Sequence, residues 1–155
     1  MSQLFKKLNY KSQDPIYILN APESFEGELA VIKTMCEVKT TIEKASSLDF
    51  VLCFASQQQQ LDEIAKKVCD KLNGDAVFWV CYPKMSSKKY SCDFNRDTGW
   101  QVFAPYRMEG VRIVAIDSDW SALRLRKVEF IKTITRRESF AISKEAKART
   151  TQKGK

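Results

Sequence analysis

Residues 49–82 read DFVLCFASQQQQLDEIAKKVCDKLNGDAVFWVCY, and this stretch decides the fold. Its two ends, 49–55 and 76–82, are short continuous apolar runs, which are typical of strands buried on both faces. Between them, residues 56–73 repeat apolar side chains at helical spacing, with Ser56 and Gln59 as a capping box and Gly74 as the stop. The order strand, helix, strand predicts a parallel pair joined by a helical crossover.

The segments before residue 49 continue the alternation of predicted strands and helices. Leu4, Phe5 and Leu8 indicate one helical turn, and residues 16–21 (IYILNA) predict a buried strand. Residues 25–35 predict a helix capped by Ser24. Residues 36–42 favour a strand, but about six residues join them to the next strand, too few for a parallel crossover. We therefore expect 36–42 to be an antiparallel edge strand or no strand.

The segments after it end the sheet. Residues 83–97 predict a polar loop and 98–108 a short helix. Residues 111–116 and 121–128 predict two strands whose short connection indicates an antiparallel hairpin. Together these elements predict a three-layer, Rossmann-like α/β fold with a mostly parallel sheet that ends in an antiparallel hairpin. We expect one domain over 1–128 and a basic extension over 129–155, disordered from about 144.

Composition and charge narrow the class of protein. The 155 residues are 44% hydrophobic and 29% charged, which provides enough apolar material for a packed core. The formal net charge is +7, and from Lys132 onward eight basic residues face two acidic ones. No apolar run is long enough to cross a bilayer, and the first residues lack the apolar stretch of a secretory signal. The expected location is the cytoplasm, with no membrane partner.

The chain has no histidine and five cysteines. The absence of histidine excludes Ser-His and Cys-His nucleophiles, so acid–base chemistry would need another side chain with a shifted pKa. The cysteines form no CxxC pair, and Cys53, Cys69 and Cys81 fall on apolar faces of predicted elements. We interpret them as reduced, packed thiols and expect no metal site.

Polar side chains follow the carboxyl ends of the predicted strands, where open α/β sheets usually bind ligands. The candidate ligand-binding residues are Asn20, Glu23, Tyr82, Lys84, Ser86, Asp117, Asp119 and Trp120. In the functional interpretation, Lys84 and the neighbouring serines hold an anion while Trp120 offers a flat face. In the structural interpretation, Asn20 shapes a turn, the two aspartates build the hairpin, Trp120 covers the end of the sheet, and Lys84 with its neighbouring serines is a solvated loop.

The loop after the first strand, NAPESFEG (20–27), argues against an ordinary nucleotide cofactor. It has one glycine, Gly27, where a dinucleotide site needs several, and its carboxylates Glu23 and Glu26 would repel phosphate. Neither GxGxxG nor GxxxxGK[ST] is present. We expect no cofactor.

A nucleic-acid interpretation rests on aromatic and basic residues in the middle loop. Tyr90, Phe94 and Trp100 flank Lys88, Lys89 and Arg96, and such a set could stack on bases and neutralise phosphates. The structural alternative is a solvated basic loop anchored by aromatics. The basic extension adds at most weak, salt-sensitive affinity. Phe78 and Trp79 lie inside a predicted strand and are assigned to the core.

Four strings carry a family resemblance: LNAPESFEG (19–27), WVCYPKMSSKKY (79–90), DFNRDTGW (93–100) and VAIDSDWSALRLRK (114–127). Together they resemble a family of bacterial proteins of unknown function with a Rossmann-like core, which implies a fold and no reaction. The order of elements from Asp49 to Val128 is similar to the C-terminal half of class I S-adenosylmethionine-dependent methyltransferases. In those enzymes a glycine-rich loop follows the first strand and an acidic residue ends the second. NAPESFEG and Glu43 stand at these places, a departure that favours a shortened, cofactor-free relative.

The sequence therefore predicts a non-enzymatic binding or interaction domain that uses the strand-end residues on a small molecule or a protein partner. The alternatives are a divergent small-molecule or S-adenosylmethionine-binding enzyme and a weak nucleic-acid binder. Because exposed edge strands can pair between subunits, a homodimer is a further candidate state.

Overall fold

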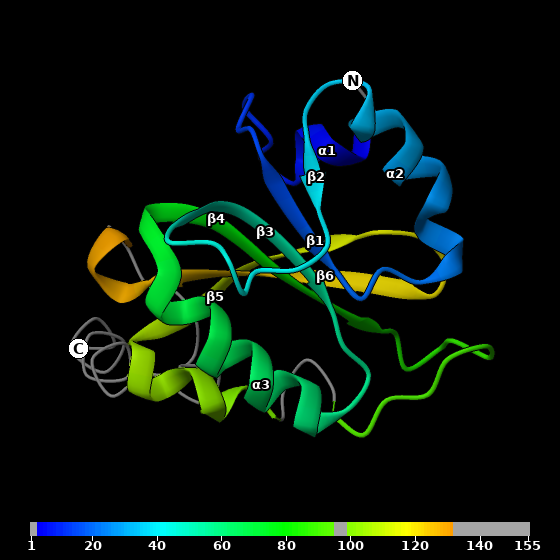
Figure 1. Ribbon diagram of the computed structural model, residues 1–155. Coiled ribbons are helices and arrows are strands. Elements are labelled where there is room, and N and C mark those ends of the chain that lie inside the picture. Colours follow the sequence, from blue (N-terminus) through cyan, green and yellow to red (C-terminus); the bar gives the residue numbers. More distant parts are fainter. Residues whose placement is uncertain (1–2, 95–98, 132–155) are drawn as a thin grey trace.

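Six strands lie in one sheet in the order β2-β1-β3-β4-β6-β5 (Figure 1). The computed structural model describes residues 3–94 and 99–131, so Arg96 and the predicted tail from about 144 lie outside the described residues. The strands are β1 (Ile16–Leu19), β2 (Val38–Lys39), β3 (Leu48–Phe54), β4 (Leu72–Pro83), β5 (Met108–Ala115) and β6 (Trp120–Lys127). β1 to β4 are parallel, whereas β6 is antiparallel to both β4 and β5. The predicted parallel sheet with a terminal antiparallel hairpin is confirmed.

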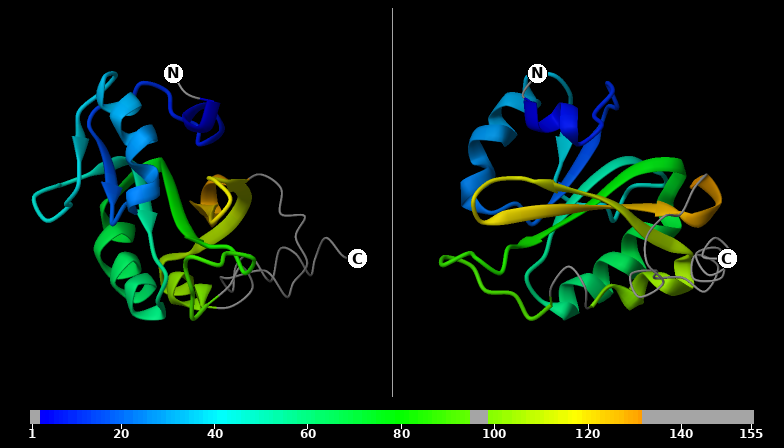
Figure 2. Two further views of the ribbon diagram at one scale, coloured as in Figure 1. Left: turned by 90° about the vertical axis from the view of Figure 1, so that its right-hand side faces the viewer. Right: turned by 180° about the vertical axis from the view of Figure 1, so that it is seen from behind.

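Helices cover both faces of this sheet (Figure 2). α1 (Gln3–Lys7) and α2 (Glu26–Lys33) pack on one face, and α3 (Gln58–Val68) with the 3-10 helix η3 (Trp100–Tyr106) packs on the other. Three shorter 3-10 helices are η1 (Glu23–Phe25), η2 (Cys69–Lys71) and η4 (Val128–Phe130). The three-layer, Rossmann-like α/β architecture follows from this arrangement.

The central strands β3 and β4 have continuous apolar runs, residues 50–54 and 76–82, because both of their faces are covered there. In β3, Phe50 and Leu52 face α1 and α2, whereas Val51 and Cys53 face α3. β4 alternates in the same way, and its Trp79 is fully buried on the α1 side, where its Nε1 donates a hydrogen bond of 2.8 Å to the carbonyl of Leu8. The prediction that Phe78 and Trp79 belong to the core is confirmed.

The sequence prediction for residues 36–42 is wrong in direction. β2 is an edge strand, but it pairs with β1 in parallel, with Val38 opposite Ile16. Residues 40–47 return to the start of β3 without a helix, crossing the α3 face, where Ile42 is buried. A parallel connection normally needs a helical crossover, because the chain must run back along the whole strand. β2 has only two residues, so the short segment 40–47 is long enough to return to the start of β3.

The helix boundaries also differ from those predicted. The capping box of α3 is made by Gln57 and Gln60, one residue after the predicted pair, and Ser24 makes no capping hydrogen bond. Gly74, predicted as the helix stop, lies at φ 56° inside β4, where the register with β3 shifts. Residues 98–108 were predicted as one helix; η3 follows Gly99, whose φ of 94° favours glycine, and Met108 already belongs to β5.

Candidate functional site

The carboxyl ends of β1, β3 and β4 and the tip of the β5–β6 hairpin meet at one edge of the sheet, as the topology predicts (Figure 1). At this edge the Nδ2 of Asn20 lies 3.4 Å from the carbonyl of Phe54, and the backbone N–H of Lys84 donates to the carbonyl of Asp119 at 2.7 Å. Asn20 is exposed and adopts a positive φ of 60°, which turns the chain away from the sheet. The edge is therefore held together by its own backbone.

The two aspartates of the hairpin make local hydrogen bonds. Oδ1 of Asp117 accepts from the backbone N–H groups of Asp119 and Trp120, at 2.8 and 2.9 Å. Oδ1 of Asp119 accepts from the hydroxyl of Ser87 at 2.9 Å, and that hydroxyl accepts from the N–H of Tyr90. Both carboxylates thus fix the hairpin and the loop beside it.

Trp120 covers the end of the sheet and does not present a free face. Its side chain is 4% exposed, lies edge-on to Phe54 with ring centroids 5.2 Å apart, and packs at 5.1 Å against Tyr90. Its Nε1 is buried without a hydrogen-bond partner among the described residues. The structural interpretation of Trp120 therefore fits the geometry better than the stacking surface.

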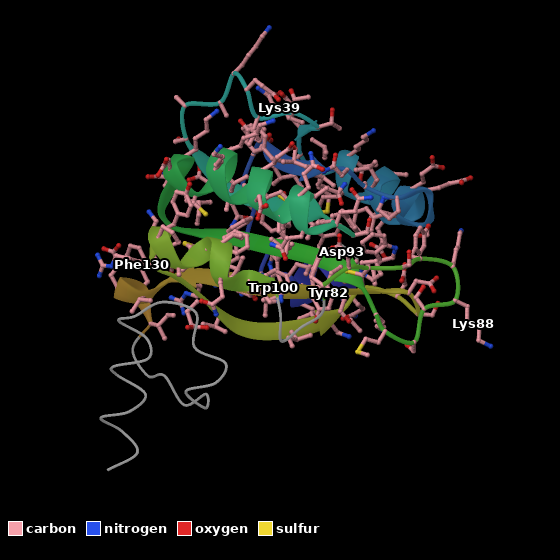
Figure 3. All side chains as sticks on the ribbon, turned by 90° about the horizontal axis from the view of Figure 1, so that it is seen from below. Lys39, Tyr82, Lys88, Asp93, Trp100 and Phe130 are labelled. Carbon is pink, nitrogen blue, oxygen red and sulfur yellow. The ribbon has the colours of Figure 1, made fainter. Side chains whose placement is uncertain are left out.

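The remaining predicted residues are scattered. Tyr82 is buried on the α3 side, 5.6 Å from the ring of Trp100, and Figure 3 shows these two side chains next to each other. Glu23 and Ser86 are exposed. Lys84 is half-buried and lines an open cavity of about 410 Å³ formed by the loop 83–94. Phe94 and Trp100, considered above as stacking residues, are buried against each other.

A groove of about 310 Å³ lies beside the carboxyl ends of β1 and β2, against α3. It contains Asn20, together with residues that the sequence prediction missed. The polar residues that line it are Asn20, Thr40, Thr41, Glu43, Gln60, Glu63 and Lys67. In the sheet, β1 lies between β2 and β3. The chain passes from β1 to β2 on one side, and β3 and the later strands lie on the other side, so the strand order reverses here. Open α/β sheets usually bind ligands at such a reversal point.

A sequence signal for part of this groove exists in α3. Gln60, Glu63, Ile64 and Lys67 follow the i, i+3, i+4, i+7 pattern, so they share one helix face. That face flanks the buried stripe of Leu61, Ala65 and Val68. Thr40 and Thr41 carry no comparable signal, because only the folded position of the 40–47 connection brings them to the groove.

The groove is rich in hydrogen-bond acceptors. Glu43 and Glu63 contribute two carboxylates against the single ammonium of Lys67. Gln60 is held in place because its Oε1 accepts from the N–H groups of Ser56 and Gln57, at 2.7 and 3.1 Å. Such a lining suits a ligand with hydroxyl or amino donors and opposes a phosphate.

No thiolate nucleophile accompanies the groove. All five cysteines are free, and four are buried. Burial raises the pKa of each thiol, to about 12 for Cys69, and raises it well above the ordinary value for Cys81. The thiols are therefore protonated near neutral pH, and the four buried ones are inaccessible as nucleophiles.

Residues 3–94 and 99–131 lack two further features. This part of the chain holds no group of three metal-ligating side chains. It also contains no helix with the length and apolar character needed to span a bilayer.

Two solved structures are similar to this chain. A protein of the NADB-Rossmann superfamily from Streptococcus agalactiae aligns over 86% of this chain and 71% of its own, with 12% identity and a TM-score of 0.43. A SAM-dependent methyltransferase from Aquifex aeolicus aligns over 81% of this chain and 88% of its own, with 9% identity and a TM-score of 0.45. No family model and no curated protein matches the sequence.

Proposed function

We propose that this chain is a non-enzymatic binding domain whose groove between β1, β2 and α3 holds a small, hydroxyl-bearing ligand that carries no phosphate. The observation that supports it is the acceptor-rich lining at the reversal point of the sheet, with two carboxylates and one ammonium. Ribose hydroxyls and amino groups would donate hydrogen bonds to Glu43 and Glu63. A phosphate there would meet an excess of negative charge.

The non-enzymatic part of the proposal rests on the side chains at the strand ends. The chain has no histidine, and the thiols have raised pKa values. The carboxylates of Asp117 and Asp119 are used in the hairpin. A binding role needs only the groove and its fixed hydrogen-bonding groups.

Thermal unfolding of the full chain with matched ligands tests this proposal. Adenosine, ribose and S-adenosylmethionine represent the expected class, and AMP, ATP and NAD the opposed class. A ligand at about 100 times its Kd should stabilise by about 2.7 kcal/mol, a shift of several degrees at this size. We expect a shift with the first class, its loss in Glu43→Gln/Glu63→Gln, and its retention in Glu23→Gln, whose carboxylate lies outside the groove. The absence of a shift with the first class would refute the proposal, as would a shift with the phosphorylated set that Glu43→Gln/Glu63→Gln alters and that therefore arises in the groove.

A divergent S-adenosylmethionine-binding enzyme is the second candidate. The strand order β4-β6-β5 supports it, since an antiparallel β6 inserted between β4 and β5 agrees with the resemblance in the sequence, and Glu43 lines the groove. S-adenosylmethionine is cationic and would be attracted by the carboxylates. A shift with S-adenosylmethionine together with methyl transfer to a cell extract, both lost in Glu43→Gln, would replace the non-enzymatic proposal with this one.

Weak nucleic-acid binding remains a prediction from the basic residues. In the described loop, Lys88 and Lys89 are exposed, and the ammonium of Lys89 lies 5.4 Å from the ring of Tyr90. Deleting the residues after Ile142 should lower affinity for single-stranded RNA and reduce its salt dependence. Unchanged affinity and salt slope would remove the basic extension from this prediction.

A further inference from the structure

A buried arginine without a partner lines a second cavity, far from the groove in the sheet. Arg124 of β6 is 7% exposed, and its Nε is buried without a hydrogen-bond partner among the described residues. Its contact is the ring of Trp79, whose centroid lies 5.9 Å from Cζ. Burial, together with the neighbouring Arg126 and Arg112, lowers the pKa of Arg124, and the carboxylate of Asp75 opposes this shift only in part.

This arrangement is costly for a purely structural residue. A buried guanidinium N–H that lacks a hydrogen bond loses its hydration without compensation. A methionine or leucine at 124 would fill the same space on Trp79, and such replacements of buried charges are often neutral or stabilising. The arginine therefore indicates a counter-ion that binds from outside the described chain.

The cavity into which Arg124 opens has a volume of about 380 Å³. It lies on the α1 side of the sheet, between the early part of β4, the late part of β6 and the loop that follows α1 (blue in Figure 1). Its lining residues are Asn9, Lys11, Gln13, Asp75, Val77, Arg124 and Arg126. This volume lies within the range of small-molecule sites.

The residues that line the cavity carry a net charge of +2, from three basic side chains and one carboxylate. Arg126 is neutralised by Asp75, with Nη2 to Oδ2 at 2.6 Å and Nε to Oδ1 at 3.0 Å. Lys11 and Arg124 have no ion pair among the described residues, so two positive charges remain. A guanidinium fork suits the paired oxygens of a phosphate or carboxylate, and a double excess matches a dianion.

We propose that this cavity, centred on Arg124, is a binding site for the phosphate monoester group of a small molecule. Arg124 would bind two phosphate oxygens through Nε and Nη, and Lys11 would neutralise the second charge. The amides of Asn9 and Gln13 are placed to contact the rest of the ligand. The site lies on the opposite face from the groove and shares no lining residue with it, so each can fail without the other.

Isothermal titration of the full chain with inorganic phosphate at constant ionic strength tests this site. We expect saturable binding that is abolished in Arg124→Met and weakened about tenfold or more in Arg124→Lys, which keeps the charge and loses the fork. Lys11→Gln should also weaken binding about tenfold. Lys66→Gln, an equal change of charge on exposed α3, should leave it unchanged. Binding should weaken from pH 7.5 to 5.5, as phosphate becomes a monoanion.

Three further results separate this site from other roles of Arg124. Sulfate should compete with phosphate, and acetate, a monoanion, should not. In the absence of phosphate, Arg124→Met should unfold at the same temperature as the wild type or higher, as expected for a residue kept for a ligand. A lower unfolding temperature combined with retained phosphate binding would overturn the proposal. So would binding of a short RNA that depends on Arg124 when phosphate and sulfate do not bind.

Discussion

Two buried tryptophans show how one residue type serves different purposes at the residue scale. Trp79 and Trp120 are both nearly inaccessible, and each packs on the α1 side of the sheet. Trp79 donates its Nε1–H to the carbonyl of Leu8, whereas Trp120 finds no partner in the described chain. The apolar run around Trp79 correctly predicted that this residue belongs to the core. The sequence around Trp120 does not show that Phe54 and Tyr90 enclose its side chain.

Replacing each tryptophan by phenylalanine should separate these roles. Trp79→Phe removes a buried hydrogen bond and leaves the Leu8 carbonyl unpaired, so it should cost about 1–3 kcal/mol more than Trp120→Phe. Both variants lose similar apolar contact, which makes Trp120→Phe the matched control. Urea unfolding followed by circular dichroism measures the difference. Equal losses would show that the Trp79 bond contributes little to stability.

The cysteines provide a second test at this scale. Cys92 is half-buried, whereas the other four are buried. At pH 8 a disulfide reagent should modify Cys92 first and more slowly than a free thiol, because burial raises its pKa as well. Cys53 and Cys81 should react only on unfolding. Cys92→Ser should remove the first phase, and a fast phase that survives this change would contradict the assignment.

At the scale of elements, the strands with a continuous apolar run in the sequence could be predicted. β3 and the second half of β4 are continuous apolar runs because helices cover both of their faces, and these runs make the two strands recognisable in the sequence. β2 has two residues, and its direction is set by where the 40–47 connection crosses the α3 face. No local pattern encodes that path, so its parallel pairing could not be inferred.

The candidate site could be predicted only in part from the sequence. The strand ends were expected at one edge, and Asn20 does lie in the groove there. The other polar lining residues come from α3 and the 40–47 connection, whose approach depends on tertiary packing. The Arg124 cavity was missed because a basic residue on a strand near the C-terminus normally faces water.

The tip of the β5–β6 hairpin should depend on one carboxylate. Asp117→Ala removes the acceptor of two backbone N–H groups, at Asp119 and Trp120, and should destabilise the fold by about 1–3 kcal/mol. Asp117→Asn keeps a carbonyl oxygen and should lose less. Hydrogen exchange at the amides of Asp119 and Trp120 should accelerate in Asp117→Ala. Protection equal to the wild type would show that strand pairing alone holds the tip.

At the scale of the whole molecule, the two cavities carry charge of opposite sign in excess. The groove on the α3 side gathers carboxylates, and the cavity on the α1 side gathers cations. The sheet between them separates the two fields by a buried apolar layer. We therefore expect a phosphate to bind in the cavity on the α1 side and to be opposed in the groove on the α3 side.

The buried acidic groups of the core predict how the fold responds to alkali. Burial raises the pKa of Tyr10 from 10.0 to about 12 and that of Cys69 from 9.0 to about 12. Between the ordinary and the raised pKa of each group, the folded chain binds more protons than the unfolded chain. The free energy of unfolding therefore falls as the pH rises through this range. The stabilisation from these groups is complete below pH 9.0 and is lost as the pH approaches about 12. Urea unfolding between pH 8 and pH 11 should show this fall. Tyr10→Phe should make it shallower above pH 10, where Tyr10 begins to ionise in the unfolded chain; an unchanged slope would mean that its hydroxyl is hydrated in the fold.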